Sequence, residues 1–545
     1  MTVADYIAEF LVSKGVRHVF GFQGSAMLKM LDAMVATGKI EYIQNFHEQA
    51  SAFAADAYAR VHGMPGVAIA TSGPGAANLM TGVANAYFDS VPVLFLTGQD
   101  RRAHVCARRK SRQNGFQDMD VVAMARKITK RAVQVLDPKS LTEELDRCWR
   151  LAQKGRKGPV LIDIPMDLQF EQMPDSAVSI PRRMPIGNNR VDMFQLDSAI
   201  EALNSAKRPV ALVGGGVRLA GACGLLDSFA HKTRIPVVST LMGLDATKET
   251  LGFSGVYGNP LPNKVLRESD CILALGTRFA FHQTGRSMDD YAPRAKVVHV
   301  DVDETELGRV CRDAACVRAD VATFLRTAES CGVSSAPAEW LARIRRWRGR
   351  CGGRPAMFPA RFLDRLFDEA PPDATFAADV GSSQMWVAQR FVATGRNRLL
   401  NSGGLGAMGF SLPAAIGASY VSEVPAVSIC GDGGFQMNLQ ELNTLALRRR
   451  NVKVFVFDNS SLGLMRGIQR NYYGSRFVGN SRCEFSCPKI CQLASAYGLK
   501  TIRIERDVDF DGIGKVFSDH EPWLVDVVVD EDEIARSRYE AEVLE

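Results

Sequence analysis

Two polar turns towards the C-terminal end of the chain combine residue types that bind divalent cations and phosphate groups. They are Gly431-Asp432-Gly433-Gly434 and Asp458-Asn459-Ser460-Ser461, and each directly follows an apolar run. Mg²⁺ takes about six hard oxygen ligands and usually shares them with phosphates. The Asp432 carboxylate and the Asn459 amide oxygen could supply two ligands, and a backbone carbonyl, at Ser461, a third. The two turns therefore predict a magnesium site beside a phosphorylated ligand.

The spacing of the two turns makes the prediction more specific. Gly431, Gly433 and Gly434 let the backbone approach phosphates closely, and a helix that begins after Gly434 would favour negative charge. Two ordinary Asx turns at strand ends are the alternative interpretation. A Gly-Asp-Gly turn followed about 27 residues later by a strand end that carries Asn is the thiamine-diphosphate signature, and Asp432 and Asn459 have this spacing. We therefore predict thiamine diphosphate and Mg²⁺ as cofactors.

The elements that must position these turns are short apolar runs that alternate with amphipathic helical stretches. Runs of this length, bounded by Gly or Asp, are typical of buried parallel strands. Strand–helix alternation predicts an α/β protein of doubly wound parallel-sheet domains, which bind ligands at the carboxyl ends of their strands. The predicted strands include 67–71, 93–97, 210–213, 271–275, 297–302, 426–430 and 452–457.

The length of 545 residues exceeds what one hydrophobic core supports and predicts several domains. Two segments resemble linkers in composition, one from Phe170 to Arg190 and one from Gly332 to Pro359. We therefore expect three domains, at residues 1–172, 190–335 and 358–545. The basic run Arg343–Arg350 is interpreted as a solvated helix face, so neither a nucleic acid nor a membrane is predicted as a partner.

Cysteine usage and hydropathy indicate the cellular compartment. The 12 cysteines form no Cys-x-x-Cys pair, and several lie in apolar runs, as Cys271 and Cys430 do. No basic region followed by an apolar run begins the chain, and no apolar stretch reaches about 18 residues. These features lead us to expect a reducing cytoplasm.

Along essentially its full length the chain resembles the catalytic subunit of acetolactate (acetohydroxyacid) synthase. Distinctive stretches carry this resemblance, and they follow the family's order. Besides the Gly-Asp-Gly turn they are Phe20-Gly21, His47-Glu48-Gln49, Thr71-Ser72-Gly73-Pro74-Gly75, Gly98-Gln99, Phe116-Gln117, Asp163-Ile164-Pro165, Gly214-Gly215-Gly216, Thr240-Leu241-Met242-Gly243, Gln384-Met385-Trp386 and Ser402-Gly403-Gly404-Leu405-Gly406-Ala407-Met408-Gly409-Phe410.

The resemblance implies a pyrimidine-binding, a central and a diphosphate-binding domain, and an active site shared between two subunits of a homodimer or tetramer. Glu48, expected at the end of a strand over 42–46, would hydrogen-bond N1′ of the aminopyrimidine, while Met408 supports the bent cofactor and the Gly406 carbonyl accepts from N4′. A helix-start acid and a core methionine are the alternative interpretations of Glu48 and Met408. Further residues implied to line the substrate or cofactor site are Gly24, Ser25, Thr71, Asn78, Phe116, Gln117, Ser382, Ser383 and Leu464.

Glycine-rich loops in the middle block, such as 214–216 and 276–278, do not match a dinucleotide fingerprint and are, by pattern alone, tight turns. The resemblance implies that these loops hold an FAD without a redox role. An ADP-like ligand or an empty remnant site is the alternative. The residues that match flavin-contacting positions are Gly215, Gly216, Thr240, Leu241, Met242, Arg278, Asp301 and Asp320.

The chain departs from the family pattern where the second substrate is expected. An arginine that holds the acceptor carboxylate in the family is His282 here, and His282 lacks the bidentate grip of a guanidinium. The family's tryptophan in the acceptor pocket is Ile468, and Ser382-Ser383 replace a Gln-His pair at the diphosphate. We therefore predict a 2-oxo acid donor such as pyruvate and an acceptor that is a ketone, an aldehyde or a keto-sugar.

Other activities fit the same residues. A simple or oxalyl-CoA-type decarboxylase and a pyruvate oxidase remain open, although His47 stands alone where pyruvate decarboxylase has paired histidines. Glyoxylate carboligase is disfavoured because that family lacks the glutamate that is present here as Glu48. An inactive regulatory homologue is the alternative from another class, and Glu48, Asp432 and Asn459 argue against it.

Overall fold

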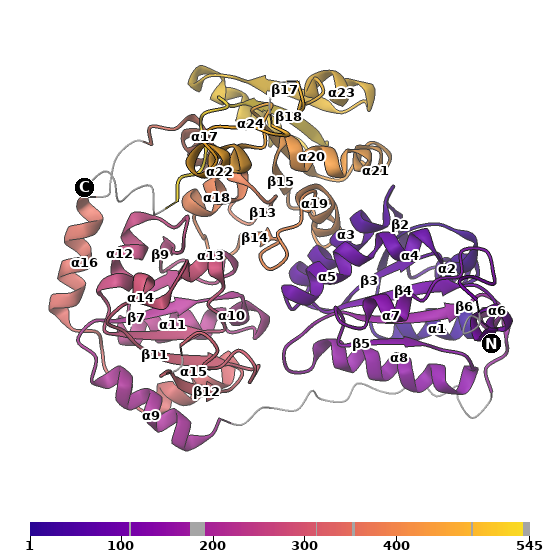
Figure 1. Ribbon diagram of the computed structural model, residues 1–545, viewed down its shortest axis with the longest axis horizontal. Helices are drawn as coiled ribbons and strands as arrows, with labels where there is room; N and C mark the ends of the chain where they lie inside the picture. Colours follow the sequence, from indigo (N-terminus) through magenta and orange to yellow (C-terminus); the bar gives the residue numbers. More distant parts are fainter. Residues whose placement is uncertain (108–110, 175–190, 312, 351–354, 481–482, 538–545) are drawn as a thin grey trace.

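The computed structural model describes residues 1–545 except 108–110, 175–190, 312, 351–354, 481–482 and 538–545. It contains three parallel sheets of six strands, each with helices packed against it (Figure 1). The predicted α/β class with three doubly wound parallel-sheet domains is confirmed. The predicted strands are present with ends that differ by at most two residues.

The N-terminal sheet has the order β2-β1-β3-β4-β6-β5. Its strands are β1 His18–Phe22, β2 Glu41–Gln44, β3 Gly66–Ala70, β4 Val93–Gln99, β5 Arg131–Gln134 and β6 Val160–Pro165. Its helices are α1 Val3–Ser13, α2 Leu28–Ala36, α3 Glu48–His62, α4 Pro74–Asn78, α5 Met80–Phe88, α6 Arg102–Ala107, α7 Val121–Ala125 and α8 Pro138–Gln153. Every residue of β3 and β4 is buried, as expected for central strands covered by helices on both faces.

The central sheet has the order β12-β11-β10-β7-β8-β9. Its strands are β7 Pro209–Val213, β8 Val237–Ser239, β9 Thr250–Phe253, β10 Cys271–Leu275, β11 Lys296–Asp301 and β12 Ala315–Arg318. Its helices are α9 Met193–Asn204, α10 Gly215–Leu219, α11 Cys223–Thr233, α12 Pro260–Glu268, α13 Phe281–Thr284, α14 Met288–Tyr291, α15 Val321–Ser330 and α16 Ala338–Arg350.

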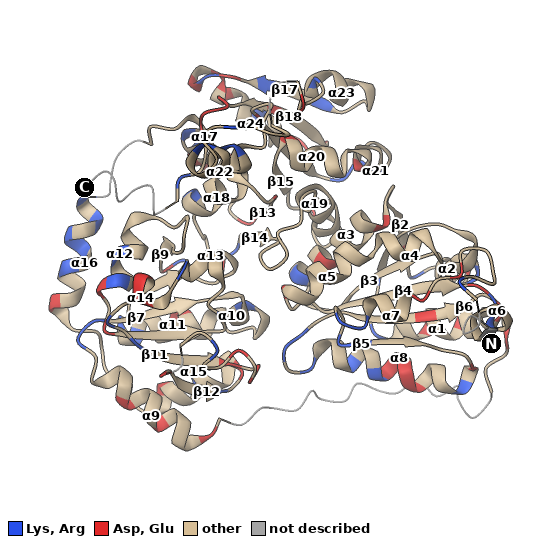
Figure 2. Ribbon diagram, viewed as in Figure 1, with Lys and Arg blue, Asp and Glu red and all other residues tan. Residues whose placement is uncertain are grey.

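Helix α16 differs from the linker expected between Gly332 and Pro359. Trp340 and Ile344 are buried against the central domain, and the Trp340 indole N–H donates to the Pro209 carbonyl at 3.0 Å. Arg345, Arg346, Arg348 and Arg350 of this helix are exposed, whereas Arg343 pairs with Glu268 of α12 at 3.0 Å (basic residues blue in Figure 2). The helix therefore belongs to the central domain and extends it beyond residue 335, and the first expected linker lies mostly outside the described residues.

The C-terminal sheet has the order β14-β13-β15-β16-β18-β17. Its strands are β13 Thr375–Ala378, β14 Arg398–Asn401, β15 Ala426–Gly431, β16 Val452–Asp458, β17 Lys500–Ile504 and β18 Trp523–Val528. Its helices are α17 Phe358–Glu369, α18 Ser382–Arg390, α19 Ser411–Ser419, α20 Asp432–Met437, α21 Leu442–Arg448, α22 Gly463–Tyr472, α23 Ile490–Ala496 and α24 Gly512–Val516.

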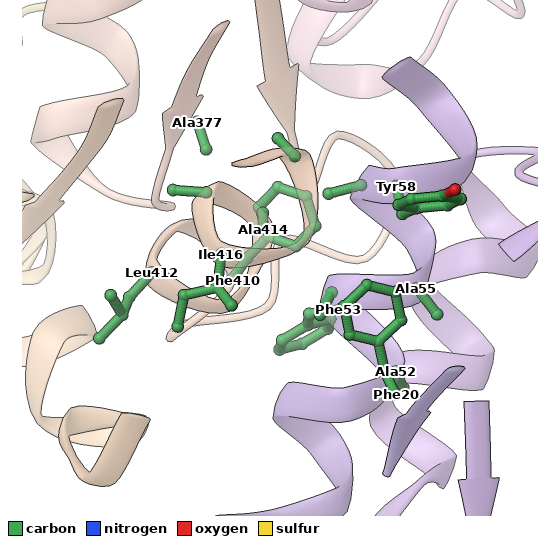
Figure 3. Packing of buried hydrophobic residues seen from close by; sticks show 14 of the residues in the cluster. Phe20, Ala52, Phe53, Ala55, Tyr58, Ala377, Phe410, Leu412, Ala414 and Ile416 are labelled. Atoms are coloured by element: carbon green, nitrogen blue, oxygen red, sulfur yellow. The ribbon is translucent and has the colours of Figure 1, made fainter. Parts of the chain in front are cut away.

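The N-terminal and C-terminal domains pack on each other through helices α3 and α19 (Figure 3). Small residues allow this close approach, because a Cβ atom on Gly417 would lie 2.1 Å from the Ala54 carbonyl oxygen. Phe53 and Phe410 meet edge to face at 5.4 Å between ring centroids. One hydrophobic cluster is thus continuous across both domains. Within the described parts of the chain, no helix has the length and apolar character needed to cross a membrane.

Candidate active site

The two predicted metal-binding turns lie next to each other at the carboxyl ends of β15 and β16, which are paired strands. Asp432 is 1% exposed, and its two carboxylate oxygens accept hydrogen bonds from the backbone N–H groups of Gly433 at 2.7 Å and Ser461 at 3.3 Å. The Ser461 N–H also approaches Asn459 Oδ1 at 3.2 Å. Burial, together with the Asp458 carboxylate nearby, raises the pKa of Asp432 to about 7. The three predicted metal-site residues are therefore in one place.

Protein packing requires glycine at two of the three glycine positions of the first turn. A Cβ atom on Gly433 would lie 2.5 Å from Leu462 Cδ2, and one on Gly434 would lie 2.7 Å from Asp379 Oδ1. Only Gly431 has open space within 4 Å of that position. Helix α20 begins at Asp432, three residues earlier than the expected start after Gly434.

The two serines that begin α18 have different surroundings. The Ser382 hydroxyl is buried and has no hydrogen-bond partner. A Cβ atom on Gly463 would lie 3.3 Å from this hydroxyl and 3.0 Å from Asn459 Nδ2, so Ser382 lies beside the second metal-binding turn. The Ser383 hydroxyl donates to the Asp379 carbonyl at 3.1 Å. An unpartnered buried hydroxyl beside the metal turn fits a polar ligand such as a diphosphate. Leu464 is half-buried in the first turn of α22.

The loop between β14 and α19 carries Gly406 and Met408 to the same edge of the sheet. Gly406 has φ +67°, and a Cβ atom on Gly433 would lie 3.3 Å from Met408 Cε. The Asp379 carboxylate, at the end of β13, accepts hydrogen bonds from Gly409 N at 3.0 Å and Ser411 N at 2.9 Å. The loop therefore holds the Met408 side chain against the Gly-Asp-Gly turn.

Asp379 should make the stability of the fold depend on pH. Full burial raises its pKa to about 6, so the folded chain binds this proton more tightly than the unfolded chain. The protonated Asp379 therefore contributes its full share to the free energy of unfolding below about pH 4. This contribution, at most ~3 kcal/mol, is lost as the pH rises through about 6. Asp379→Asn cannot titrate, so its urea midpoint should fall less between pH 5 and pH 7.5 than that of the wild type. Equal falls in both proteins would contradict this assignment.

A second group of predicted residues lies at the carboxyl edge of the N-terminal sheet. Glu48 is 5% exposed, and its Oε2 accepts a hydrogen bond from Asn78 Nδ2 at 2.9 Å. A Cβ atom on Gly75 would lie 3.0 Å from Glu48 Oε1 and 2.8 Å from Thr71 Cγ2. Strand β2 ends at Gln44, two residues before the expected end of this strand, and Glu48 follows it as the first residue of α3.

The remaining predicted substrate residues surround this group on the same edge. Gly24 packs on Thr71, because a Cβ atom there would lie 2.5 Å from Thr71 Cβ, and Ser25 begins the short 3₁₀ turn that follows. Gln117 has φ +61° and its backbone packs against Gly73. Phe116 is 85% exposed and projects from this edge without cover.

We call Glu48, Thr71, Gly75 and Asn78 the Glu48 group, and Asp432, Gly433, Asn459 and Ser461 the Asp432 group. Among the described residues, no hydrogen bond or ion pair joins a member of one group to a member of the other. The contact between their domains in this region runs instead through Glu441, which accepts from Asn45 Nδ2 at 2.9 Å and Phe46 N at 2.8 Å.

The central domain contains a cavity of about 600 Å³ at the carboxyl ends of its strands. All eight residues predicted to contact a flavin line its wall. A Cβ atom on Gly216 would lie 2.6 Å from Gly276 Cα, so the two loops can approach each other this closely only because both positions are glycine. Arg156 and Lys157 of the N-terminal domain close one side. The size and place of the cavity suit a nucleotide-type ligand.

Comparison with known proteins assigns each domain. Residues 1–124, 196–328 and 379–527 match, in turn, the N-terminal TPP binding domain, the central domain and the C-terminal TPP binding domain of thiamine pyrophosphate enzymes. The chain is 34% identical to the acetolactate synthase of Arthrospira platensis, with 98% of this chain and 95% of the relative covered. It is 33% identical to the large subunit of acetolactate synthase from Cyanidium caldarium, over 97% of this chain and 93% of the relative.

The chain belongs to the acetolactate synthase family of thiamine-pyrophosphate enzymes. A probable acetolactate synthase large subunit of Methanocaldococcus jannaschii is also 34% identical, over 97% of this chain and 92% of the relative. The resemblance identified from the sequence motifs is confirmed. The protein is thus an acetolactate synthase-like enzyme that depends on thiamine diphosphate.

The two residues predicted to depart from the family pattern in the acceptor pocket lie in two different places. His282 lies on α13 at the wall of the central cavity, next to Phe281, which is 64% exposed. Ile468 is half-buried on α22, the helix that follows the metal turn. Neither residue provides a fixed cation for a carboxylate.

Two residues that shape the site were missed by the sequence analysis. Asp379 follows a short apolar strand, and a strand-end Asp is the same signal that identified Asp432. Asn480 is 3% exposed, and its Oδ1 accepts from Ser461 Oγ at 2.9 Å and Leu462 N at 2.7 Å. It is 18 residues from Leu462 in an irregular segment, so no sequence pattern marks it.

Proposed function

We propose that the enzyme decarboxylates a 2-oxo acid, such as pyruvate, and transfers the acyl unit to an acceptor carbonyl. The observation that carries the proposal is the buried Glu48 carboxylate, held by Asn78 at an edge that also presents Thr71 and Gly24. The carbon–carbon chemistry itself is supplied by bound thiamine diphosphate, which stabilises the carbanion left by decarboxylation.

The residues of the chain have distinct parts in this proposal. The Asp432 carboxylate, the Asn459 amide and the Ser461 carbonyl bind Mg²⁺, and the unpartnered Ser382 hydroxyl donates to the diphosphate. Mg²⁺ takes about six oxygen ligands, so phosphate oxygens and water would complete the coordination. Met408 and Gly406 support the pyrimidine, and Glu48 exchanges a proton with its N1′ atom.

The active site in this proposal is shared by two chains of a homodimer or of a tetramer built from dimers. The Glu48 group of one chain would face the Asp432 group of its partner. The exposure of apolar side chains beside each group supports this arrangement. Phe116 is 85% exposed near Glu48, and Met437, at the end of α20, is 54% exposed.

The acceptor in this proposal is an uncharged carbonyl compound, a ketone, an aldehyde or a keto-sugar. A second 2-oxo acid would place its carboxylate near His282 and Ile468. Neither side chain offers the paired N–H donors that a guanidinium uses to grip a carboxylate. An acceptor that carries hydroxyl or alkyl groups needs no such grip.

This proposal predicts poor homocoupling of pyruvate. Incubated with pyruvate alone, the enzyme should form acetolactate slowly and without saturation, because no clamp orients the second pyruvate. A panel of ketones, aldehydes and keto-sugars should include acceptors that raise the rate of CO₂ release and give a new product by mass spectrometry. Rapid, saturable acetolactate formation would reject the altered acceptor. Acetaldehyde as the only product would indicate a decarboxylase, and electron transfer to a quinone would indicate an oxidase.

We also propose that the central cavity binds FAD without a redox role. All eight predicted contact residues line the cavity, and its glycine loops leave backbone accessible to a phosphate. The purified enzyme should release a stoichiometric flavin on denaturation, and chemical reduction of that flavin should leave the carboligation rate unchanged. Recovery of ADP, or of no nucleotide, would replace this assignment by one of its alternatives.

A further inference from the structure

A buried polar network lies between the N-terminal and C-terminal domains, outside the residues already assigned. Arg60, near the C-terminal end of α3, donates to Asp56 at 2.6 Å and to Asp89 at 3.0 Å. Asn85 of α5 donates to the other oxygen of Asp56 at 3.2 Å. The Arg60 side chain is 7% exposed, and those of Asp56 and Asp89 are 0% and 3% exposed.

This network holds the start of the loop that carries Gly406 and Met408. The Asp89 carboxylate accepts hydrogen bonds from Gly403 N at 3.0 Å and Gly404 N at 2.7 Å. Arg60 donates to the Asn401 carbonyl at 2.8 Å, across 341 positions of sequence.

A serine inside the loop extends the same connection. The Ser402 hydroxyl donates to Asn85 Oδ1 at 2.5 Å and accepts from Ala407 N at 2.8 Å, directly before Met408. The far end of the loop is held within its own domain, where Asp379 accepts from Gly409 N and Asn438 donates to the Gly409 carbonyl at 2.8 Å. The positions of Gly406 and Met408 therefore depend on the N-terminal domain at one end and on the C-terminal domain at the other.

Helix α3 consequently has two functional ends. Glu48 is its first residue, whereas Arg60 is twelve residues later, which corresponds to ~18 Å along the helix axis. In one chain, Glu48 and the loop held by Arg60 are therefore at opposite ends of the same rigid element. Buried charges of this kind persist only when they are paired and hydrogen-bonded, and every charge in this network is.

We propose that Arg60, Asp89 and Asn85 are positioning residues that fix the Gly406–Met408 loop, and that α3 thereby serves two active sites at once. Its first residue acts in one site of the dimer, and its last two turns set the cofactor-supporting loop of the other. The second half of this proposal rests on the shared site of the proposed function.

The first test measures cofactor binding, which needs no turnover. Asp89→Asn retains the shape of the side chain but leaves one acceptor oxygen for two loop N–H groups, and Ser402→Ala removes the bond to Ala407. Each should weaken thiamine diphosphate binding, measured by calorimetry with Mg²⁺ present, and lower kcat by about tenfold to a hundredfold. The KM for the 2-oxo acid should change little.

Lys14→Met is the matched control. It breaks another buried ion pair of the same domain, Lys14–Asp146 at 3.4 Å, which does not reach the loop. A general loss of stability would affect all three variants, whereas the proposed role affects cofactor affinity only in the two network variants. Because Asp89 also lines the central cavity, nucleotide content is measured in each protein. Unchanged cofactor affinity in both network variants would overturn the positioning role.

The second test asks which site each lesion damages. Dimers that contain two different chains are isolated with two affinity tags. When one chain carries Glu48→Gln and its partner carries Asp89→Asn, both lesions fall in one site, so about half of the wild-type activity should remain. When a single chain carries both substitutions and its partner is wild type, each site is damaged once, and activity should fall well below half.

The outcomes separate the two proposals. The reverse pattern, with more activity when both lesions are in one chain, would show that each active site lies within one chain and would overturn the shared site. Equal, half-maximal activity in both mixed dimers would show that Asp89→Asn damages no site, and would overturn the positioning role alone.

Discussion

Replacement of Glu48 by glutamine should lower turnover by about a hundredfold to ten-thousandfold, the range expected when a positioned acid–base group is lost. The amide has the same shape but cannot exchange a proton with N1′ of the aminopyrimidine. Its hydrogen bond with Asn78 can be kept, because Asn78 donates and the glutamine oxygen can accept. Binding of thiamine diphosphate should therefore weaken much less than turnover falls. Rates of CO₂ release and calorimetric binding of the cofactor measure the two quantities separately.

Glu9→Gln is the control for this prediction. Glu9 lies on the exposed side of α1 in the same domain, so the same change of charge should leave turnover unchanged. A Glu48→Gln enzyme with wild-type turnover would remove Glu48 from catalysis and would favour the interpretation of this residue as an ordinary acid at a helix start. Unfolding of the variant would be visible as a lower melting temperature, which Glu9→Gln should not show.

The fold could be predicted from the sequence because its strands are short apolar runs with clear boundaries. The run 271–275 became β10 without a change of bounds, and 426–430 became β15 with one more residue. The segment around α16 was misread because its glycines and prolines lie at both ends of the helix and its arginines dominate the composition. The two tryptophans that anchor it pack edge to face at 5.7 Å, a tertiary contact that composition does not reveal.

Site residues could be predicted where neighbouring strand ends bring them together, and not where only the packing of distant segments does. Asp432, Asn459 and the glycines follow strands that are neighbours in the sheet, so strand ends alone bring them together. Glu48 was found through the motif around it, although its place on a helix was not. The N-terminal-domain residues that hold the start of the Met408 loop are more than 300 positions away from it, as Asn85 is from Ser402, and only the packing of α3 on α19 makes them neighbours. Such contacts leave no periodic or spacing signal in a single sequence.

Asp432→Asn should abolish activity at physiological magnesium concentrations, because the substitution removes the only carboxylate predicted to bind the cation. Asn459 and the Ser461 carbonyl are neutral ligands, and a diphosphate without its cation would meet no fixed positive charge from this set. The backbone bonds that Gly433 and Ser461 make to Asp432 can be kept only in part, since an amide has one acceptor oxygen where the carboxylate has two. We expect the Mg²⁺ concentration for half-maximal activation to rise by at least about tenfold, the effect of losing ~1.4 kcal/mol of binding.

A high concentration of Mg²⁺ should restore part of the Asp432→Asn activity, whereas it should not restore Glu48→Gln, because the two substitutions act on different steps. Asp530→Asn is the matched control, since Asp530 also follows a strand of this sheet and its Oδ1 accepts a local backbone bond from Asp532 N at 2.8 Å. Its magnesium dependence should equal that of the wild type.

Removal of the cation from the wild-type enzyme by a chelator should reproduce the Asp432→Asn defect and release thiamine diphosphate. If Asp432→Asn retained the wild-type magnesium dependence, the cation would have to bind elsewhere, and the diphosphate would then rest on Ser382 and backbone N–H groups alone.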